Sequence, residues 1–404
     1  MKQNFITGID IGSSSIRCAV GQKGSPEAPL QIVGLSEAPS EGVFKGVITS
    51  IEDTVSALTA CLEKAERMIG APVEHALVGF STPSVLAQTS KGAVAVSHPD
   101  KEIKEDDVKR VIEAAKAIAT PSNYEILHIL PRSFTIDSAS GIKDPLGMTG
   151  VRLEVEAVIL QGLTSQINTF TRVVHRTGIE INDVVVGPLA CAEALLTRRQ
   201  KELGVGLLNI GAATTSLLVF QEGDLLHAKV FPVGAGHITS DIAIGLRIPL
   251  DSAERIKIEY GIASSSEVSK KEEIALEDAS LEQGSFSRKY LAEIIEARLE
   301  EIFSMVDSEL KKVGSAGPLP FGVVLTGGGA KLTGVANLAK RELRLPASGG
   351  LPQNLTSAID RNNDPIFSTA LGLVTWGQEA EIKTTQKGSF RLSQAGNVLK
   401  RLFK

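Results

Sequence analysis

The feature that most constrains the fold of this chain is an internal duplication. Residues 8–24 (GIDIGSSSIRCAVGQKG) and residues 207–223 (LLNIGAATTSLLVFQEG) align without a gap at a constant offset, 207 − 8 = 199. Each copy has an apolar run, an Asp or Asn, Ile-Gly, a group of small or hydroxyl residues, a second apolar run and a glycine. This pattern predicts a strand, a tight glycine turn and a second strand, which form a β-hairpin. Two copies half a chain apart predict two related lobes.

The turns of the two hairpins suit a phosphate group. Gly12 and Gly211 lack a Cβ, so the backbone can approach a ligand closely, and consecutive amides in such a turn can bind an anion. The hydroxyl groups that add further donors belong to Ser13, Ser14, Ser15, Thr214 and Thr215. Asp10 precedes the first turn and can hold Mg²⁺ through water, because this ion prefers carboxylates and retains waters. The alternative is a pair of ordinary hairpins whose turns contain small residues.

A third glycine cluster lies in residues 322–343 (GVVLTGGGAKLTGVANLAKREL). A short β-branched run, three glycines and apolar residues at helical spacing predict a strand, a turn and a helix. The segment has no G-K-[ST] and is not a P-loop. By itself it can be a loop between packed elements. Together with the two hairpins it predicts a cleft in which two phosphate turns face each other and a third turn admits a flat base.

The composition excludes several other classes of protein. The chain has 404 residues, 43% of them hydrophobic and 22% charged, which is typical of a soluble protein of two or three domains. Its net charge of −5 argues against nucleic acid as a partner. Three widely spaced cysteines indicate a reducing compartment and no zinc site. Because no apolar run approaches the ~20 residues of a transmembrane helix, we expect a cytoplasmic protein.

The three turns together resemble the actin-like ATPase superfamily, and longer segments resemble the bacterial cell-division family FtsA. Residues 241–261 (DIAIGLRIPLDSAERIKIEYG) carry D-I-A and A-E-x-I-K, and residues 130–156 contain I-x-D-P-x-G-M-x-G. Residues 106–118 and 367–377 resemble the helix before the FtsA insert and the return of the chain to the first lobe. The resemblance implies an α/β, actin-like two-lobed fold of duplicated ribonuclease-H-like domains.

The resemblance also implies subdomain boundaries. The base of the first lobe would be residues 1–82, 163–200 and 366–380, and its insert would be residues 83–162. The base of the second lobe would be residues 201–247 and 314–365, and its outer subdomain would be residues 248–313.

The family pattern places the nucleotide on residues from all three turns and one helix. The matching residues are Asp10, Gly12, Ser13, Ser14, Ser15, Asn209, Gly211, Ala212, Ala213, Thr214, Thr215, Gly234, Glu254, Lys257, Gly327, Gly328, Gly329 and Ala330. Glu254 and Lys257 are three apart on a predicted helix and share one face. Their alternative role is a plain surface ion pair. The implied ligands are ATP and Mg²⁺, the latter bound to Asp10 through water.

The second hairpin departs from the family pattern. Asn209 stands where the family usually has Asp, and Ala212 and Ala213 replace a usual Gly pair. We expect Mg²⁺ to be held less firmly by one carboxylate, and the alanines to restrict positive φ. Hydrolysis is therefore expected to be slow or absent. Asp10 and Glu193 are the two catalytic candidates, and Glu193 is better explained as a solvated helix residue.

The C-terminal tail predicts a membrane anchor. Residues 378–389 are polar and predict a linker, and residues 381–404 hold six Lys or Arg and one acid, 6 − 1 = +5. A short basic amphipathic helix lies in the interface of an anionic membrane. Within 390–404 the membrane-binding residues would be Phe390, Leu392, Val398, Leu399, Lys400, Arg401, Leu402, Phe403 and Lys404. The alternative is a terminal helix docked on its own globule.

The resemblance finally implies partners. FtsA-like proteins form actin-like filaments on the cytoplasmic face of the membrane at the division site. They tether FtsZ through its C-terminal peptide and contact other division proteins through the insert. The FtsZ contact would be Arg298, which is either presented to a carboxylate-rich peptide or lies with its stem on the core. The competing interpretations are a cytoplasmic scaffold of type IV pilus assembly and a sugar kinase of the same superfamily.

Overall fold

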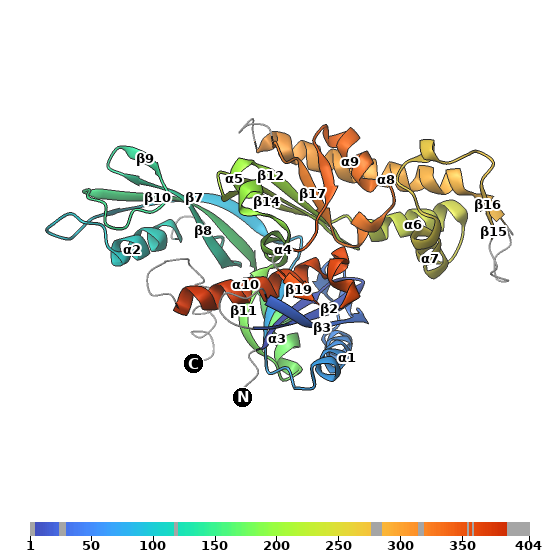
Figure 1. Ribbon diagram of the computed structural model, residues 1–404, viewed down its shortest axis with the longest axis horizontal. Helices are drawn as coiled ribbons and strands as arrows, with labels where there is room; N and C mark the ends of the chain where they lie inside the picture. The colour runs from blue at the N-terminus through green and yellow to red at the C-terminus, as the bar shows by residue number, and fades with distance from the viewer. Residues whose placement is uncertain are drawn as a thin grey trace.

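The computed structural model describes residues 5–23, 30–116, 120–275, 285–313, 319–353, 355–357 and 359–385, and two sheets dominate it (Figure 1). The first has the order β11-β6-β1-β2-β3-β19, and the second the order β14-β13-β12-β17-β18. The strands of the first sheet are β1 (Phe5–Ile11), β2 (Ser15–Gln22), β3 (Leu30–Pro39), β6 (His75–Phe80), β11 (Glu180–Val186) and β19 (Leu355–Ser357). The strands of the second sheet are β12 (Val205–Ile210), β13 (Thr215–Gln221), β14 (Asp224–Phe231), β17 (Val323–Thr326) and β18 (Ala347–Gly349).

The two sheets repeat one connection plan. In each, three successive antiparallel strands (β1-β2-β3 and β12-β13-β14) are extended on the other side by two parallel strands. The first hairpin pairs Ile11 with Ile16, and the second pairs Ile210 with Thr215, so both turns lie at the same end of their sheets. The predicted duplication and the two-lobed α/β fold are confirmed.

Helices cover both sheets. On the first lobe these are α1 (Ile51–Ile69), α3 (Thr164–Arg176), α4 (Gly187–Leu195) and α10 (Ser368–Thr385), with the short hairpin β4 (Val43–Phe44) and β5 (Val47–Ile48). On the second lobe they are α5 (Arg198–Leu203), α6 (Ala235–Leu246), α7 (Leu250–Tyr260), α8 (Arg288–Lys312) and α9 (Val335–Leu343), with β15 (Glu273–Ala275) and β16 (Ser285–Ser287). Short 3₁₀ turns are η1 (Ser265–Glu267), η2 (Gly328–Lys331), η3 (Asp360–Asn363) and η4 (Pro365–Phe367). The buried stripe of α8 consists mainly of Leu291, Ala292, Ile295, Leu299, Ile302, Phe303 and Val306.

A separate unit lies between β6 and α3. It comprises β7 (Leu86–Ala95), α2 (Glu105–Lys116), β8 (Tyr124–Ile136), β9 (Ala139–Ile142) and β10 (Arg152–Leu163). Its strands form a four-stranded sheet, β7-β10-β8-β9, and α2 packs on β7 and β10 around a core of its own. In Figure 1 this insert extends to the left, and α6, α7 and α8 lie at the opposite end of the molecule.

The structure corrects two of the predicted boundaries. Residues 355–357, expected in the second lobe as part of 314–365, form β19 and pair in parallel with β3, Leu355 opposite Leu30. The exposed edge of β3 offers unpaired backbone groups that this segment satisfies. The second correction concerns α10, which continues to Thr385, so residues 378–385 of the expected linker are helical. No Gly or Pro interrupts them.

The rest of the tail, including the predicted anchor at 390–404, lies outside the described residues. Among the helices that the structure describes, none combines the length and apolar character that crossing a bilayer requires.

Candidate functional site

The two hairpin turns are equivalent in their hydrogen bonds as well as in sequence. The Gly12 amide donates to the Ser15 carbonyl at 3.2 Å, and the Gly211 amide donates to the Thr214 carbonyl at 2.8 Å. A Cβ at Gly12 would stand 2.8 Å from the Ser15 carbonyl oxygen, and one at Gly211 would stand 3.0 Å from that of Thr214. Neither glycine has a positive φ. Glycine is needed at both positions because the turn folds tightly back on itself.

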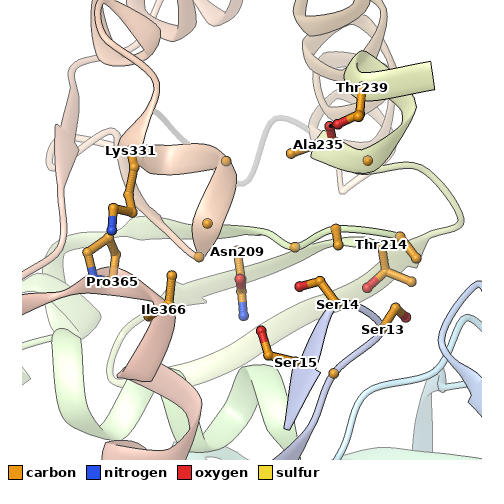
Figure 2. A pocket seen from close by; sticks show the side chains of 18 of the residues that line it. Ser13, Ser14, Ser15, Asn209, Thr214, Ala235, Thr239, Lys331, Pro365 and Ile366 are labelled. Atoms are coloured by element: carbon orange, nitrogen blue, oxygen red, sulfur yellow. Dashed lines mark hydrogen bonds between the residues drawn. The ribbon is translucent and has the colours of Figure 1, made fainter. Parts of the chain in front are cut away.

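The turns face a cavity of about 750 Å³ between the lobes. Figure 2 shows Ser13, Ser14 and Ser15 near Thr214, with Asn209 at the centre of the view. The predicted residues that line the cavity are Asp10, Gly12, Ser13, Ser14, Ser15, Asn209, Gly211, Ala212, Ala213, Thr214, Glu254, Lys257, Gly327, Gly328 and Gly329. All three glycine turns therefore converge on one space.

Four candidates are not part of the cavity wall. Thr215 is fully buried at the start of β13. Gly234 packs behind the second turn, where a Cβ would stand 2.4 Å from the Gly211 carbonyl oxygen. Ala330 lies within η2, one residue past the three glycines that reach the cavity. The Glu193 carboxylate pairs with the Lys201 ammonium at 2.9 Å, which favours an ordinary helix residue over a catalytic one.

Asp10 is the carboxylate of the two hairpins. It is 9% exposed, and burial raises its pKa to about 6, although the positive charge of Arg17 acts in the opposite direction. Arg17 donates to the Ser15 hydroxyl at 2.7 Å and pairs with Glu37 at 3.0 Å. The equivalent of Asp10, Asn209, is neutral and donates from Nδ2 to the Cys191 sulfur at 3.6 Å. The pair of turns thus has one carboxylate, as the sequence predicted.

Lys257 does not form a plain surface ion pair, because it is buried and has several polar partners. Its side chain is buried, and Nζ contacts the Glu254 carboxylate at 2.6 Å, the Thr239 hydroxyl at 2.8 Å and the Ala235 carbonyl at 3.2 Å. Glu254 is 46% exposed on the cavity side of α7. The pair fixes α7 against the start of α6, so the ammonium is both positioned and shielded at the cavity.

The second turn is covered by the start of α6. Ala212 and Ala213 were expected to restrict positive φ, and neither position has a positive φ. The Ala235 amide donates to the Gly211 carbonyl at 2.8 Å, and the Gly236 amide donates to the Ala212 carbonyl at 2.7 Å. The alanines are compatible with this conformation, so Asn209 is the main departure of the second hairpin.

Some residues of the wall were not predicted. They include Thr239, Leu250, Ile258, Lys331, Pro365 and Ile366. Lys331 follows the three glycines after one residue, Ala330, and a cation after a glycine turn was a usable signal. Pro365 and Ile366 have no local sequence signal, because they come to the site through a contact that is distant in sequence. The Pro365 carbonyl accepts a hydrogen bond from the Thr326 hydroxyl at 3.3 Å.

Comparison with known proteins identifies the family. Residues 206–372 match the sequence profile described as "Cell division protein FtsA", and residues 84–161 match the "SHS2 domain inserted in FTSA". The chain is 35% identical over 378 residues to cell division protein FtsA of Pseudomonas aeruginosa, which covers 93% of this chain and 90% of that protein. It is 39% identical over 368 residues to FtsA of Bacillus subtilis, covering 91% and 82%. This chain belongs to the FtsA family.

Solved structures agree with FtsA membership at the level of the fold. A chain of the PilM-PilN type IV pilus biogenesis complex superposes with a TM-score of 0.68 at 18% identity, covering 92% of this chain and 98% of that one. MreB5 of Spiroplasma citri gives a TM-score of 0.57 at 13% identity, covering 95% and 99%. The fold is therefore actin-like. Because sequence identity supports FtsA and the pilus protein shares only the fold, the cell-division interpretation is confirmed over the pilus scaffold.

Proposed function

We propose that this cell-division protein binds ATP with Mg²⁺ between its lobes and polymerises as an actin-like filament on the inner face of the cytoplasmic membrane, where it tethers the FtsZ ring. The observation that carries the nucleotide site is the pair of equivalent turns facing one cavity. Each turn offers backbone amides and hydroxyl groups, which suit adjacent phosphates of one ligand. Family membership supports the division role.

An adenine nucleotide suits the remainder of the cavity. Leu250 and Ile258 of α7 line it and are 58% and 72% exposed, so a flat base has apolar surface to cover. The η2 turn brings backbone of Gly328 and Gly329 to the same wall. Structures of MreB5 bound to ADP and to AMPPNP share the fold, with TM-scores of 0.57 and 0.58. These likenesses support a nucleotide between the lobes.

The residues present fit a water-held Mg²⁺ on Asp10. The Asp10 carboxylate is buried, faces the cavity and forms no salt bridge among the described side chains, and a bound cation would oppose the effect of burial on its pKa. The described residues contain no cluster of three metal-binding side chains, in keeping with an ion that keeps most of its waters. Bound Mg²⁺ would neutralise phosphate charge, while Asp10 orients its waters.

The proposed FtsZ contact lies on α6 and α8. Arg298 is 24% exposed and bonds Asp241 through Nε at 2.6 Å and Nη2 at 2.9 Å. On the same two helices, Ile244 of α6 and Tyr290 of α8 are 76% and 45% exposed. Exposed apolar side chains and a guanidinium on one pair of helices fit a peptide with apolar and acidic residues. Other division proteins would bind the 83–162 insert, and the 390–404 segment would bind anionic lipid.

The first experiment separates the nucleotide site from the anchor. Isothermal titration calorimetry of the full chain with ATP, with and without Mg²⁺, should show binding that Gly211→Val abolishes. Gly349→Val is the control, because nothing lies within 4 Å of a Cβ there. Absence of binding by the unmodified chain would overturn the nucleotide proposal.

Co-sedimentation with anionic vesicles tests the membrane role. The full chain should pellet, a chain ending at residue 388 should not, and Mg-ATP should increase pelleting if filaments form on lipid. Equal pelleting of the two chains would contradict the anchor. Failure of both to pellet would favour a helix docked on the globule.

A further inference from the structure

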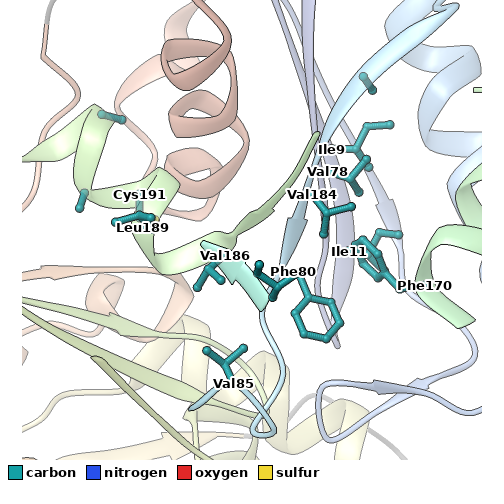
Figure 3. Packing of buried hydrophobic residues seen from close by; sticks show 14 of the residues in the cluster. Ile9, Ile11, Val78, Phe80, Val85, Phe170, Val184, Val186, Leu189 and Cys191 are labelled. Carbon is teal, nitrogen blue, oxygen red and sulfur yellow. The ribbon is translucent and has the colours of Figure 1, made fainter. Parts of the chain in front are cut away.

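Strand β8 of the insert contacts the helix that leads to the C-terminus. His128 is buried, and its Nε2 accepts a hydrogen bond from the Val186 amide at 3.0 Å. Val186 ends β11 and packs in the first-lobe core of Figure 3. The His128 ring packs edge-on against Trp376 of α10, with ring centroids 5.4 Å apart and planes at 62°. The insert is therefore seated on α10 as well as on the first sheet.

The same strand is fastened to the second lobe four residues farther along. The Arg132 carbonyl accepts from the Lys143 ammonium at 3.2 Å, and the same ammonium donates to the Glu222 carbonyl at 3.3 Å. Lys143 also pairs with Asp224, which is 24% exposed. Glu222 and Asp224 belong to the β13–β14 turn, so Lys143 joins β8 to the second lobe, in addition to the packing of β14 on β7, β8 and β10.

Between these two points β8 is a stiff element. It pairs with β10 from Tyr124 to Ile136, and α2 closes a core on the sheet. Four strand residues span ~13 Å. Register shifts lie beside both contacts, between Glu156 and Ala157 and between Leu160 and Gln161. Such bulges re-aim side chains, which explains how one strand presents contacts to two different lobes.

We propose that β8 transmits movement of the second lobe to Trp376 and thereby to α10. Closure of two lobes on a ligand displaces the β13–β14 turn, and a packed insert follows its anchor as a unit. The inference rests on the proposed nucleotide site, because ATP is the ligand expected to move the lobes. Trp376 does not line the cavity, so any response of this residue to ATP must be transmitted. The regulated element is the helix immediately before the predicted anchor.

The test uses Trp376 fluorescence in the full chain, because this is the single tryptophan of the sequence. ATP binding is measured separately by calorimetry. Lys143→Met removes the bonds of this lysine to the β13–β14 turn and leaves the packing of β14 on the insert in place. Lys91→Met is the matched control, because Lys91 pairs with Glu156 at 3.5 Å inside the insert. We expect equal ATP affinity in all three proteins and an ATP-dependent shift of Trp376 emission in the unmodified chain and in Lys91→Met. The shift should fall at least threefold in Lys143→Met. Binding without an emission change, or a full response in Lys143→Met, overturns the proposal.

A second measurement decides the inference if ATP does not bind. Acrylamide quenching of Trp376 without nucleotide should rise about twofold in Lys143→Met and stay unchanged in Lys91→Met. Absence of ATP binding would then count against the proposed function alone. Equal quenching in both variants would overturn the connection through β8, whatever calorimetry shows.

Discussion

The side-chain oxygen of Asn209 lies against Gly327, where a Cβ would stand 2.3 Å from it. The same Cβ would stand 2.6 Å from the Ile210 carbonyl oxygen, and Gly327 has a φ of 83°. Space and backbone conformation therefore both require glycine. The contact joins the end of β12 to the η2 turn, so the second and third glycine turns of the cavity are built as one unit.

Comparing Gly327→Ala with Gly178→Ala separates the effect of limited space from the effect of a positive φ. Gly178 also has a φ of 83°, but nothing lies within 4 Å of a Cβ there. We expect Gly178→Ala to lower the free energy of unfolding by about 1 kcal/mol through backbone strain. Gly327→Ala should cost about 2 kcal/mol more, because the methyl group overpacks the turn. Thermal unfolding followed by circular dichroism compares them, and equal midpoints would contradict the contact with Asn209.

Asn209→Asp restores a second carboxylate at the cavity. The unmodified chain should hydrolyse ATP more slowly than about 1 s⁻¹, the lower end for kinases. We expect Mg²⁺-dependent phosphate release to rise at least about tenfold in the variant, because two carboxylates orient the ion and its waters better than one. Asn209→Ser, which adds no charge, is the control. Fast turnover by the unmodified chain, or no gain in Asn209→Asp, would count against the explanation.

Lys257→Met tests whether the α7 ion pair is structural. The variant leaves Glu254 without its cation, and a half-buried pair of this kind should cost about 2 kcal/mol when broken. Lys311→Met removes an exposed helical pair with Asp307 and should cost less than about 0.5 kcal/mol. Urea unfolding gives both values. A similar loss in the two variants would mean that Lys257 contributes no more than a surface lysine.

The acid sensitivity of the fold should depend on His128. Burial lowers its pKa from 6.5 to about 4, so its contribution to stability is present above pH 6.5 and is lost as pH falls toward 4. This difference in pKa between the unfolded and folded states corresponds to about 3 kcal/mol in the free energy of unfolding. His128→Gln should therefore become more stable relative to the unmodified chain as pH decreases over this range. Urea unfolding at a series of pH values measures it.

Asp183 provides the control of opposite sign. Burial raises its pKa from 3.8 to about 6, against a hydrogen bond from Trp376 that lowers it. The contribution of Asp183 to the free energy of unfolding is therefore present below pH 4 and is lost as pH rises toward 6. Asp183→Asn should thus lose relative stability on acidification, where His128→Gln gains it. Parallel pH profiles for the two variants would contradict both assignments.

The sequence predicted the turns of the site but not their surroundings. The duplicated hairpins were predictable because their chemistry is local and repeats at a fixed offset. The inward direction of Thr215 was not, because one residue at a strand end decides which face a side chain takes. The edge strand β19 was missed because pairing across more than 300 residues leaves no local pattern. Pro365 was missed because it meets the site through Thr326, which is also distant in sequence. The contact of Lys143 with the second lobe is unpredictable for the same reason.

The last prediction distinguishes the two roles of Arg298. Arg298→Ala should weaken binding of a fluorescein-labelled FtsZ C-terminal peptide, measured by anisotropy, and leave calorimetric ATP affinity unchanged. Asp241→Asn is the informative partner, because it removes one of the two carboxylates that hold the guanidinium and leaves the pair with Glu301 on the same helix. If Arg298 is presented to an acidic peptide, this variant should bind the peptide as tightly as the unmodified chain or more tightly. If Arg298 only braces α8 against α6, both variants should lose peptide affinity together, because the surface made by Ile244 and Tyr290 would be displaced. Unchanged peptide affinity in Arg298→Ala would remove this residue from the interface.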